Sequence, residues 1–173
     1  DVDELGGPAF RARVRHTTRR ISTLHFLREG AWVWLIPLRG GVTSVGLVCE
    51  ATRYRPDLRT PEAFLGFLRE QRALAQLLAD AKPIDMGAYT QLAYRTKQFF
   101  ARDRWGCVGE AACFTDPFYS PGADFIALEN DMLCDLVERD HAGESLDAVG
   151  ERAQQRDAGM QLREEWTMRL YRG

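Results

Sequence analysis

The sequence lacks several features that would mark a common functional class. Its four cysteines include no CxxC pair and sit among apolar neighbours, as expected of reduced, buried thiols. No signal peptide is visible, and no apolar run reaches the roughly 20 residues that span a bilayer. The three histidines lie too far apart to share a metal, and the formal net charge of −2 gives no support for a nucleic-acid or membrane partner. These absences favour a cytoplasmic globular protein without a metal site.

Residues 10–49 carry the clearest strand pattern in the chain. The segments 12–17 and 19–26 alternate in part between apolar and polar residues, whereas 31–38 and 42–48 are rich in β-branched and aromatic residues. Glycine-containing breaks separate the last three segments, where a hairpin turn needs a positive φ. We therefore predict antiparallel strands in this region, three of which form a meander.

The rest of the chain predicts helices with a few short strands. The expected elements are a helix over 60–80, a strand over 86–96, a short buried strand beginning at Trp105, and helices over 123–139 and 145–171. Thr60 suits the N-cap of the first helix, and Pro61 suits its first helical position. The predicted fold class is α+β, in which an antiparallel sheet precedes a strand–loop–helix unit and C-terminal helices.

One stretch joins a buried strand to a helix in a way that suits ligand binding, namely residues 108–127, VGEAACFTDPFYSPGADFIA. Glu110 follows the strand end at Gly109, and Gly122 opens the helix. A helix N-terminus offers unpaired N–H groups and a positive partial charge, and a carboxylate accepts hydrogen bonds from sugar hydroxyls. These parts suit a flavin with its ribityl chain. An ordinary connection, in which Glu110 is a cap and Gly122 merely starts a helix, is equally consistent with the residues.

A family resemblance begins with WVWLIP at residues 32–37, which matches the WxWxIP signature of the flavin-dependent halogenases at its four fixed positions. Trp32 and Trp34 are two residues apart, so both side chains point to one face of a strand. The resemblance implies that this strand lies beside a flavin and screens it from the substrate, which makes Trp32 and Trp34 the catalytic-site residues. On periodicity alone, the two indoles are also consistent with the core of a sheet.

The stretch at 108–127 is similar to the second flavin-binding motif of FAD-dependent monooxygenases and halogenases, with Glu110 in place of the usual aspartate. The resemblance covers residues 20–137 and implies FAD as the cofactor. Its expected cofactor-binding residues are Gly109, Glu110, Asp116, Pro117, Pro121 and Gly122, of which Pro121 and Gly122 also form the expected halide site. Two motifs in the right order make the resemblance specific at the level of the family.

The resemblance implies a reaction and its partners. In this family a reduced flavin reacts with oxygen to give a hydroperoxide, which is used to halogenate a small organic substrate. A separate flavin reductase supplies the reduced flavin. The family also has an N-terminal dinucleotide-binding GxGxxG unit and a lysine that delivers the halogen. Neither is found here, since Lys82 and Lys97 are the only lysines and neither lies in a matching context.

These departures shape the expected organisation. We expect a C-terminal fragment of a longer enzyme, inactive in isolation, in which residues 1–100 form the substrate-side region and residues 101–173 hold the second flavin motif and the trailing helices. Proline has no N–H, so Pro121 removes half of the expected halide donors. This loss weighs against halogenation more than against flavin binding.

Two alternatives remain open from the sequence. The first is an FAD-dependent monooxygenase on the same scaffold, and the second is a non-catalytic fragment or interaction module. Among the other polar residues, Glu129 and Asp131 are expected to be solvated. Cys113 is expected to be an inert buried thiol, because no resolving cysteine lies next to it.

Overall fold

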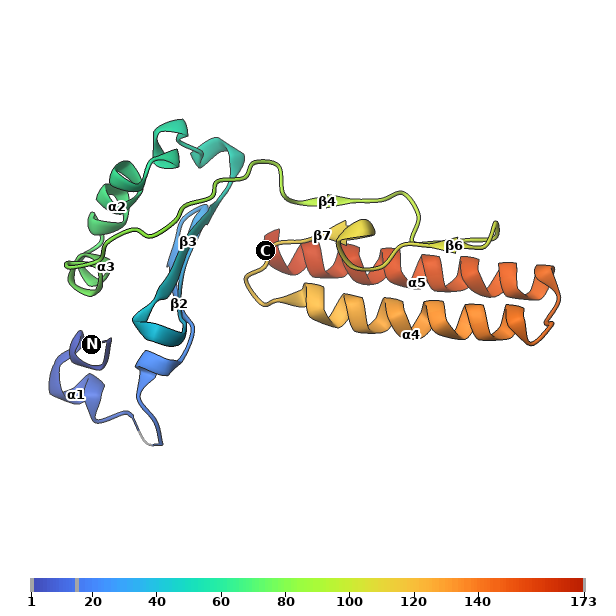
Figure 1. The fold of residues 1–173 in the computed structure, drawn as a ribbon, viewed down its shortest axis with the longest axis horizontal. Helices are drawn as coiled ribbons and strands as arrows, with labels where there is room; N and C mark the ends of the chain where they lie inside the picture. The colour runs from blue at the N-terminus through green and yellow to red at the C-terminus, as the bar shows by residue number, and fades with distance from the viewer. Residues whose placement is uncertain (1, 15, 173) are drawn as a thin grey trace. The chain divides into compact units, whose positions relative to one another are not determined.

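The chain folds into two units, Asp1–Ala88 and Tyr89–Gly173 (Figure 1). The computed structural model describes residues 2–14 and 16–172, with side chains up to residue 169. The first unit is built around an antiparallel sheet and the second around two long helices, which confirms the α+β class. The expected functional division at residue 100 remains a prediction.

The elements outside the central sheet and the two long helices are short. In the first unit they are α1 (Gly7–Arg11), α2 (Pro61–Arg69), α3 (Arg72–Leu77) and 3₁₀ turns at Val2–Glu4, Arg19–Ile21, Arg39–Gly41, Ala51–Arg53 and Pro56–Arg59. In the second unit they are β4 (Tyr94–Arg95), β5 (Phe100–Ala101), β6 (Trp105–Gly106), the 3₁₀ helix η6 (Gly109–Ala111) and β7 (Cys113–Phe114). In the part of the chain that the structure describes, none of the helices is long and apolar enough to cross a membrane.

The first unit contains the predicted meander. Strands β1 (Leu24–Arg28), β2 (Ala31–Pro37) and β3 (Thr43–Cys49) pair antiparallel in the order β1-β2-β3. In the register of these strands, Trp34 lies opposite His25 on one side and Gly46 on the other. The register therefore sets which residues share a face with the two tryptophans.

One face of the meander carries the core of this unit. Val33 and Leu35 of β2 are buried in a cluster with Leu68, Leu74 and Leu78. Because side chains alternate along a strand, these two β2 residues point away from the side on which the tryptophans stand. The helices α2 and α3 supply the leucines that cover this face, and α2 lies beside the sheet in Figure 1.

The helix expected over 60–80 is interrupted, and this expectation was wrong in its length. Thr60 is the N-cap as predicted, and its hydroxyl accepts a hydrogen bond from the Ala63 N–H. Gln71 is extended, at φ −91° and ψ 120°, so the chain turns there and α3 begins. The turn lets the Arg69 guanidinium donate to the carbonyl of Leu78 at the end of α3, at 2.9 Å. A single straight helix could not make this contact.

Two expected strands were wrong. In the segment 12–17 the chain leaves α1, a helix with Pro8 in its first turn, and continues as turns, while Arg15 lies outside the described residues. The segment 86–96 contains only the two-residue strand β4, since residues 87–93 are exposed and Gln91 takes a positive φ of 56°. An apolar and aromatic composition did not suffice here, because these residues have no neighbouring strand to pair with.

The strand expected to begin at Trp105 forms, but it was wrong to expect it to be buried. It is the two-residue strand β6, which pairs with β5, and the Trp105 side chain is 46% exposed. In this pair of strands, the fully buried residue is Phe100 of β5. Strand β6 then leads into η6 as the sequence predicts.

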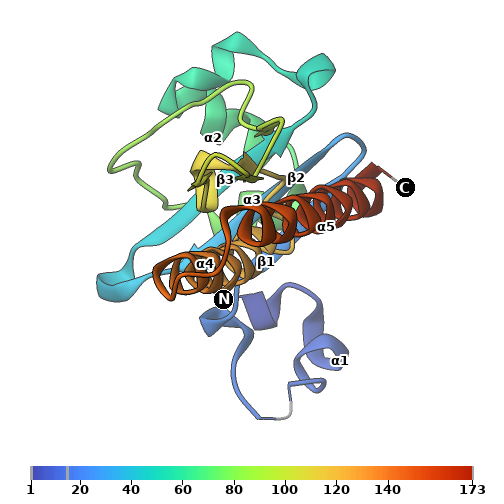
Figure 2. The same ribbon diagram turned by 90° about the vertical axis from the view of Figure 1, so that its right-hand side faces the viewer.

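The second unit is a pair of long helices with the short strands packed against them. Helices α4 (Pro121–His141) and α5 (Leu146–Arg172) confirm the two predicted helices, although α4 begins two residues earlier than expected, and they lie side by side in both views (Figures 1 and 2). Their buried residues share one core with β5 and β7, including Phe99, Phe100, Phe125, Leu136 and Met160. This core fixes the connection between β6 and α4, which carries the second predicted motif.

Candidate functional site

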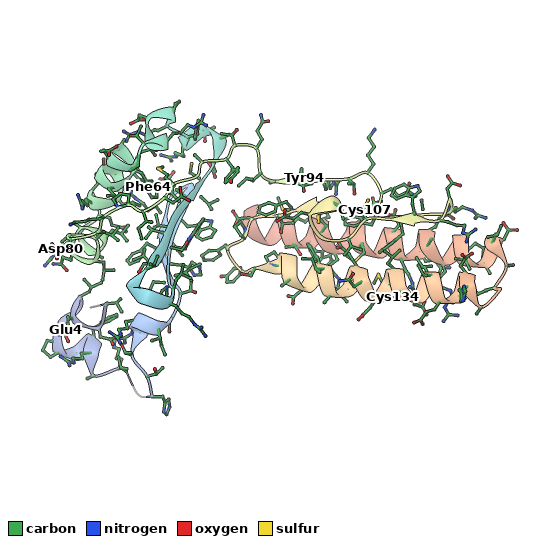
Figure 3. The ribbon with its side chains drawn as sticks, viewed as in Figure 1. Glu4, Phe64, Asp80, Tyr94, Cys107 and Cys134 are labelled. Atoms are coloured by element: carbon green, nitrogen blue, oxygen red, sulfur yellow. The ribbon has the colours of Figure 1, made fainter. Side chains whose placement is uncertain are left out.

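Trp32 and Trp34 lie on the face of the meander opposite its core. Both are half-buried, and their ring centroids are 5.6 Å apart with an interplanar angle of 49°. His25 stands edge-on to Trp32 at 5.4 Å, so three aromatic rings share this face. Phe64 of α2 packs on the other side, against the core (Figure 3). The indoles therefore lie outside the buried core cluster of this unit.

The orientation of Trp34 depends on two residues of β3 to which the sequence analysis gave no role. The Trp34 Nε1–H donates to the hydroxyl of Ser44 at 3.1 Å. Gly46 lies directly opposite Trp34, and a Cβ atom at that position would overlap the six-membered part of the indole ring. Glycine therefore makes room for the ring to lie flat over the neighbouring strand. The signal was present in the strand pattern, because a glycine inside a strand marks a close approach.

The turn that follows β6 is the 3₁₀ helix η6. Gly109 opens it with a φ of +64°, a left-handed conformation that favours glycine. The Glu110 side chain is exposed, while its backbone carbonyl accepts a hydrogen bond from the hydroxyl of Tyr94, which is labelled on β4 in Figure 3. Ala112 and Cys113 are buried directly after the turn. The backbone is thus fixed while the Glu110 carboxylate is left available to a ligand.

The loop after β7 shapes the start of α4. The Asp116 carboxylate accepts the Phe118 N–H at 2.9 Å, and the Pro117 carbonyl accepts the Ser120 N–H at 3.0 Å. Ser120 then takes a left-handed φ of 53°, and the helix begins at the next residue. Asp116 and Pro117 thus each accept one of the hydrogen bonds that shape this loop, and their expected role in cofactor binding stays a prediction.

The first turn of α4 is open at Gly122. Gly122 is exposed, and no heavy atom lies within 4 Å of the position that a Cβ would take. The first N–H groups of a helix have no partner within the helix, so this end of α4 presents donors and a positive partial charge. Pro121 supplies no donor of its own. The donors near the expected halide site are thus those of Gly122 and the residues that follow it.

Glu129 was expected to be solvated, and this expectation was wrong. Its side chain is fully buried, and its Oε2 atom accepts the N–H of Gly109 at 2.6 Å. Burial raises the pKa of the Glu129 carboxyl, and the hydrogen bond from Gly109 opposes this shift. The signal was its position on the apolar stripe of α4, between the buried residues Phe125 and Leu136 at helical spacing. Asp131 is exposed, as expected.

Cys113 lies beside this carboxyl without the features of a reactive thiol. It is buried, and burial together with the negative charges of Glu129 and Glu164 raises its pKa to about 11. A thiolate, not a thiol, is the nucleophile, so this cysteine is inert near neutral pH, as expected. Among the residues that the structure describes, no group of three or more histidine, cysteine, aspartate or glutamate side chains is arranged to hold a metal ion.

The structure brings the residues of the second motif together around α4. Gly109 packs against this helix through Ile126, where a Cβ on the glycine would come within 3.3 Å of the Ile126 side chain. Pro121 and Gly122 begin the same helix. Trp32 and Trp34 form a second group on the meander. The expectation that the indoles flank a flavin held by the turn stays a prediction.

Comparison with known proteins shows that the chain is similar to several halogenases. No model of a known protein family matches the chain. The chain is 33% identical over 120 residues to the flavin-dependent halogenase chlA of Dictyostelium discoideum, covering 67% of this chain and 20% of that protein. It is 31% identical over 108 residues to the tetracycline 7-halogenase of Kitasatospora aureofaciens, covering 58% of this chain and 20% of that enzyme.

A bacterial brominase extends the comparison. The 1H-pyrrole-2-carbonyl-(peptidyl-carrier protein) brominase of Pseudoalteromonas luteoviolacea is 25% identical over 121 residues, covering 68% of this chain and 30% of the brominase. The chain thus spans 20% to 30% of the length of these relatives. The comparisons confirm the resemblance predicted from the two motifs, because over about two thirds of its length this chain is a flavin-dependent-halogenase-like sequence.

Proposed function

We propose that this chain supplies the substrate-side sheet and the second flavin-binding motif of a flavin-dependent halogenase. The observation that carries the proposal is the position of Trp32 and Trp34, which are half-buried on the face of the meander opposite its core. Two large aromatics that the core does not use suit a wall within an active site. The relatives support the reaction class, since each of the three compared is named as a halogenase or brominase.

The cofactor that the relatives' names imply is a flavin, and we propose FAD. The residues of the second motif fit its parts: the exposed Glu110 carboxylate accepts hydrogen bonds from ribityl hydroxyls, and the open surface at Gly122 admits a flat ring against the first turn of α4. Gly109 gives the turn its left-handed conformation. A bound reduced flavin would supply the activation of oxygen that halogenation requires.

Three residues of this chain act on the other reactants in the proposal. Trp32 and Trp34 exclude water and keep the organic substrate apart from the cofactor, since a dry wall protects reactive intermediates. At the start of α4, the N–H of Gly122 binds halide with the neighbouring helix donors, because Pro121 has none to give. The further proposed partners are a small organic substrate and a separate flavin reductase, and the proposed compartment is the cytoplasm.

The proposal is tested by grafting. The 120 matched residues of the Dictyostelium discoideum halogenase are replaced by those of this chain, and the graft is assayed for bound flavin by absorbance. We expect the graft to hold FAD and to give a chlorinated or brominated product with the halide supplied. The purified chain alone should be colourless, because half a cofactor site cannot offset the loss of freedom on ordering FAD.

The same assay separates the alternatives. A hydroxylated product without halogen, from a graft that retains flavin, would identify the monooxygenase function. A graft that folds and binds no flavin would support the non-catalytic alternative and overturn the proposal. Trp32→Phe and Trp34→Phe in the graft are expected to retain FAD while lowering the yield of halogenated product, since they thin the wall without touching the second motif.

A further inference from the structure

The carboxyl of Glu129 is buried without the partners that a buried charge normally has. No part of the side chain is exposed to solvent. Its Oε2 atom accepts one hydrogen bond, from the Gly109 N–H, and among the described residues its Oε1 atom has no partner. Burying a carboxylate that is not fully paired is unfavourable. A residue retained in this state calls for a role beyond filling space.

The other buried glutamate of this unit shows the contrast. Glu164 of α5 is also buried, but its Oε2 atom forms an ion pair with the Arg95 guanidinium at 2.8 Å. No ion pair to Glu129 is formed by any residue within the described ranges. Cys113 on β7 lies close enough to feel the negative charges of both Glu129 and Glu164, and the charge of Glu164 is paired with Arg95 on β4. Among the described residues, the one hydrogen bond that the Glu129 side chain makes goes to the turn.

The hydrogen bond from Gly109 ties the first residue of the turn to α4. Gly109 takes a left-handed φ of +64°, and its N–H points to the carboxyl on α4, 20 residues further along the chain. Tyr94 holds the next carbonyl, that of Glu110, from the side of β4. The turn is therefore held at two consecutive residues by groups from two different elements.

We propose that Glu129 is a positioning residue that holds the Gly109 turn in the conformation needed to present Glu110 to the ligand. This inference rests on the proposed flavin-binding role of that turn. A hydrogen bond to a charged acceptor is stronger than one to a neutral acceptor, so the ionised carboxyl holds the turn more firmly than the protonated acid. Gln at the same position keeps an acceptor oxygen and loses the charge, whereas Leu has about the same size and no acceptor.

The first experiment measures the Gly109 amide by NMR in the whole 173-residue chain. Hydrogen exchange at Gly109 should become about tenfold faster or more in Glu129→Leu and stay within about threefold of wild type in Glu129→Gln. The Gly109 amide shift should titrate with pH in the wild type and not in Glu129→Gln. The matched controls are Glu138→Leu and Glu138→Gln, at an exposed position of α4, and should change neither signal.

Two outcomes overturn the inference from these data. The first is unchanged exchange at Gly109 in Glu129→Leu, and the second is failure of Gln to rescue it. If the Leu variant does not fold, the pH titration of the Gly109 amide in the wild type and Glu129→Gln still decides. A shift that titrates equally in both proteins would assign the effect to another group and exclude Glu129.

The second experiment measures FAD affinity in the graft described above. Glu129→Leu should weaken FAD binding about tenfold, and Glu129→Gln should restore most of it. If the Glu129→Leu graft binds FAD normally although its Gly109 amide exchanges rapidly, then Glu129 holds the turn but FAD binding does not depend on it. That outcome overturns the positioning role and leaves the flavin proposal intact. A graft that binds no FAD overturns the proposed function, and the amide measurements then decide whether Glu129 holds the turn.

Discussion

The two candidate regions differ in how the chain holds them. On the meander, the ring of Trp34 is fixed by Ser44 and Gly46, which are 10 and 12 positions away and lie on the adjacent strand. In the second unit, Gly109 is held by Glu129 on a long helix, and Glu110 by Tyr94 on a separate two-residue strand. The indole pair depends on a single hairpin, whereas the turn depends on three elements meeting correctly.

This difference has a practical meaning for both motifs. A site held by neighbouring strands keeps its geometry wherever the hairpin forms, because register alone sets it. A turn supported from distant elements keeps its geometry only while the surrounding core is intact. We therefore expect the turn to respond to changes throughout its unit, and the indole face to respond mainly to changes at its own strands.

The largest effect is expected from Phe99→Ala. Phe99 is fully buried in the core of the second unit, and replacing such a phenylalanine by alanine typically lowers the free energy of unfolding by about 3–5 kcal/mol. Hydrogen exchange followed by peptide segment should show faster exchange in α4, α5 and the Gly109 turn. The control Leu162→Ala, at a residue 56% exposed on α5, should change stability by less than about 0.5 kcal/mol. Equal effects of both changes would contradict the placement of this core.

Gly46→Ala should be the largest disturbance of the meander. The added Cβ overlaps the Trp34 ring, and such overpacking typically costs about 1–3 kcal/mol. We expect a loss of near-ultraviolet circular dichroism from the indole pair and a lower midpoint of urea unfolding. Gly66→Ala is the matched control, since Gly66 lies inside α2 with no atom near its missing Cβ, and it should stabilise the chain by about 0.5–1 kcal/mol. An unchanged spectrum in Gly46→Ala would disprove the close approach.

Gly109→Ala tests the turn from its backbone. An alanine pays about 1–2 kcal/mol to adopt a left-handed conformation, and its Cβ would come within 3.3 Å of Ile126. Chemical denaturation should show a loss of this size, with weaker FAD binding in the graft. Gly159→Ala on α5, where no atom lies within 4 Å of the added Cβ, should be stabilising. A Gly109→Ala protein as stable as wild type would show that the positive φ is not required.

The smallest effect is expected from Ser44→Ala. Removing the hydroxyl leaves the Trp34 Nε1–H without its partner, at a cost of about 0.5–1.5 kcal/mol. The wavelength of maximum tryptophan emission should shift, because the Trp34 indole N–H then meets solvent in place of the Ser44 hydroxyl. Thr43→Ala, at the neighbouring exposed residue on the other face of β3, should leave the emission unchanged. If Ser44→Ala and Thr43→Ala shift the tryptophan emission equally, the shift reports a change in the whole strand and not the loss of the Ser44 hydrogen bond.

The sequence predicted the meander and the long helices because each has a strong local pattern. Alternation and glycine-containing breaks defined β1 to β3, and the Thr60 cap with Pro61 defined the start of α2. The motif residues were also found from the sequence, since WVWLIP and the Gly-Glu pair resemble a family signature. Periodic residue patterns and family motifs are therefore the features that can be recognised in a single sequence.

The failures arose where tertiary contacts decided the outcome. The turn at Gln71, across which Arg69 bonds to Leu78, interrupts the expected helix, and the residues before β4 have no strand to pair with. Glu129 was misjudged because a charged residue on a helix is usually solvated, although its place on the apolar stripe of α4 pointed to burial. The role of Gly46 was missed because it depends on the register, which places Trp34 opposite it.

The long-range ties of the second unit bear on the order in which it forms. Arg95 of β4 meets Glu164 of α5 across 69 positions, and the Phe99 N–H donates to Asp157 across 58. A ribosome adds about 5–20 residues per second, so α5 is synthesised several seconds after β4 and β5. The helical hairpin, whose contacts are closer in sequence, is expected to assemble before the strands and the ligand turn settle onto it. Nascent chains halted before α5 should therefore lack the ties of Arg95 and Phe99 to that helix.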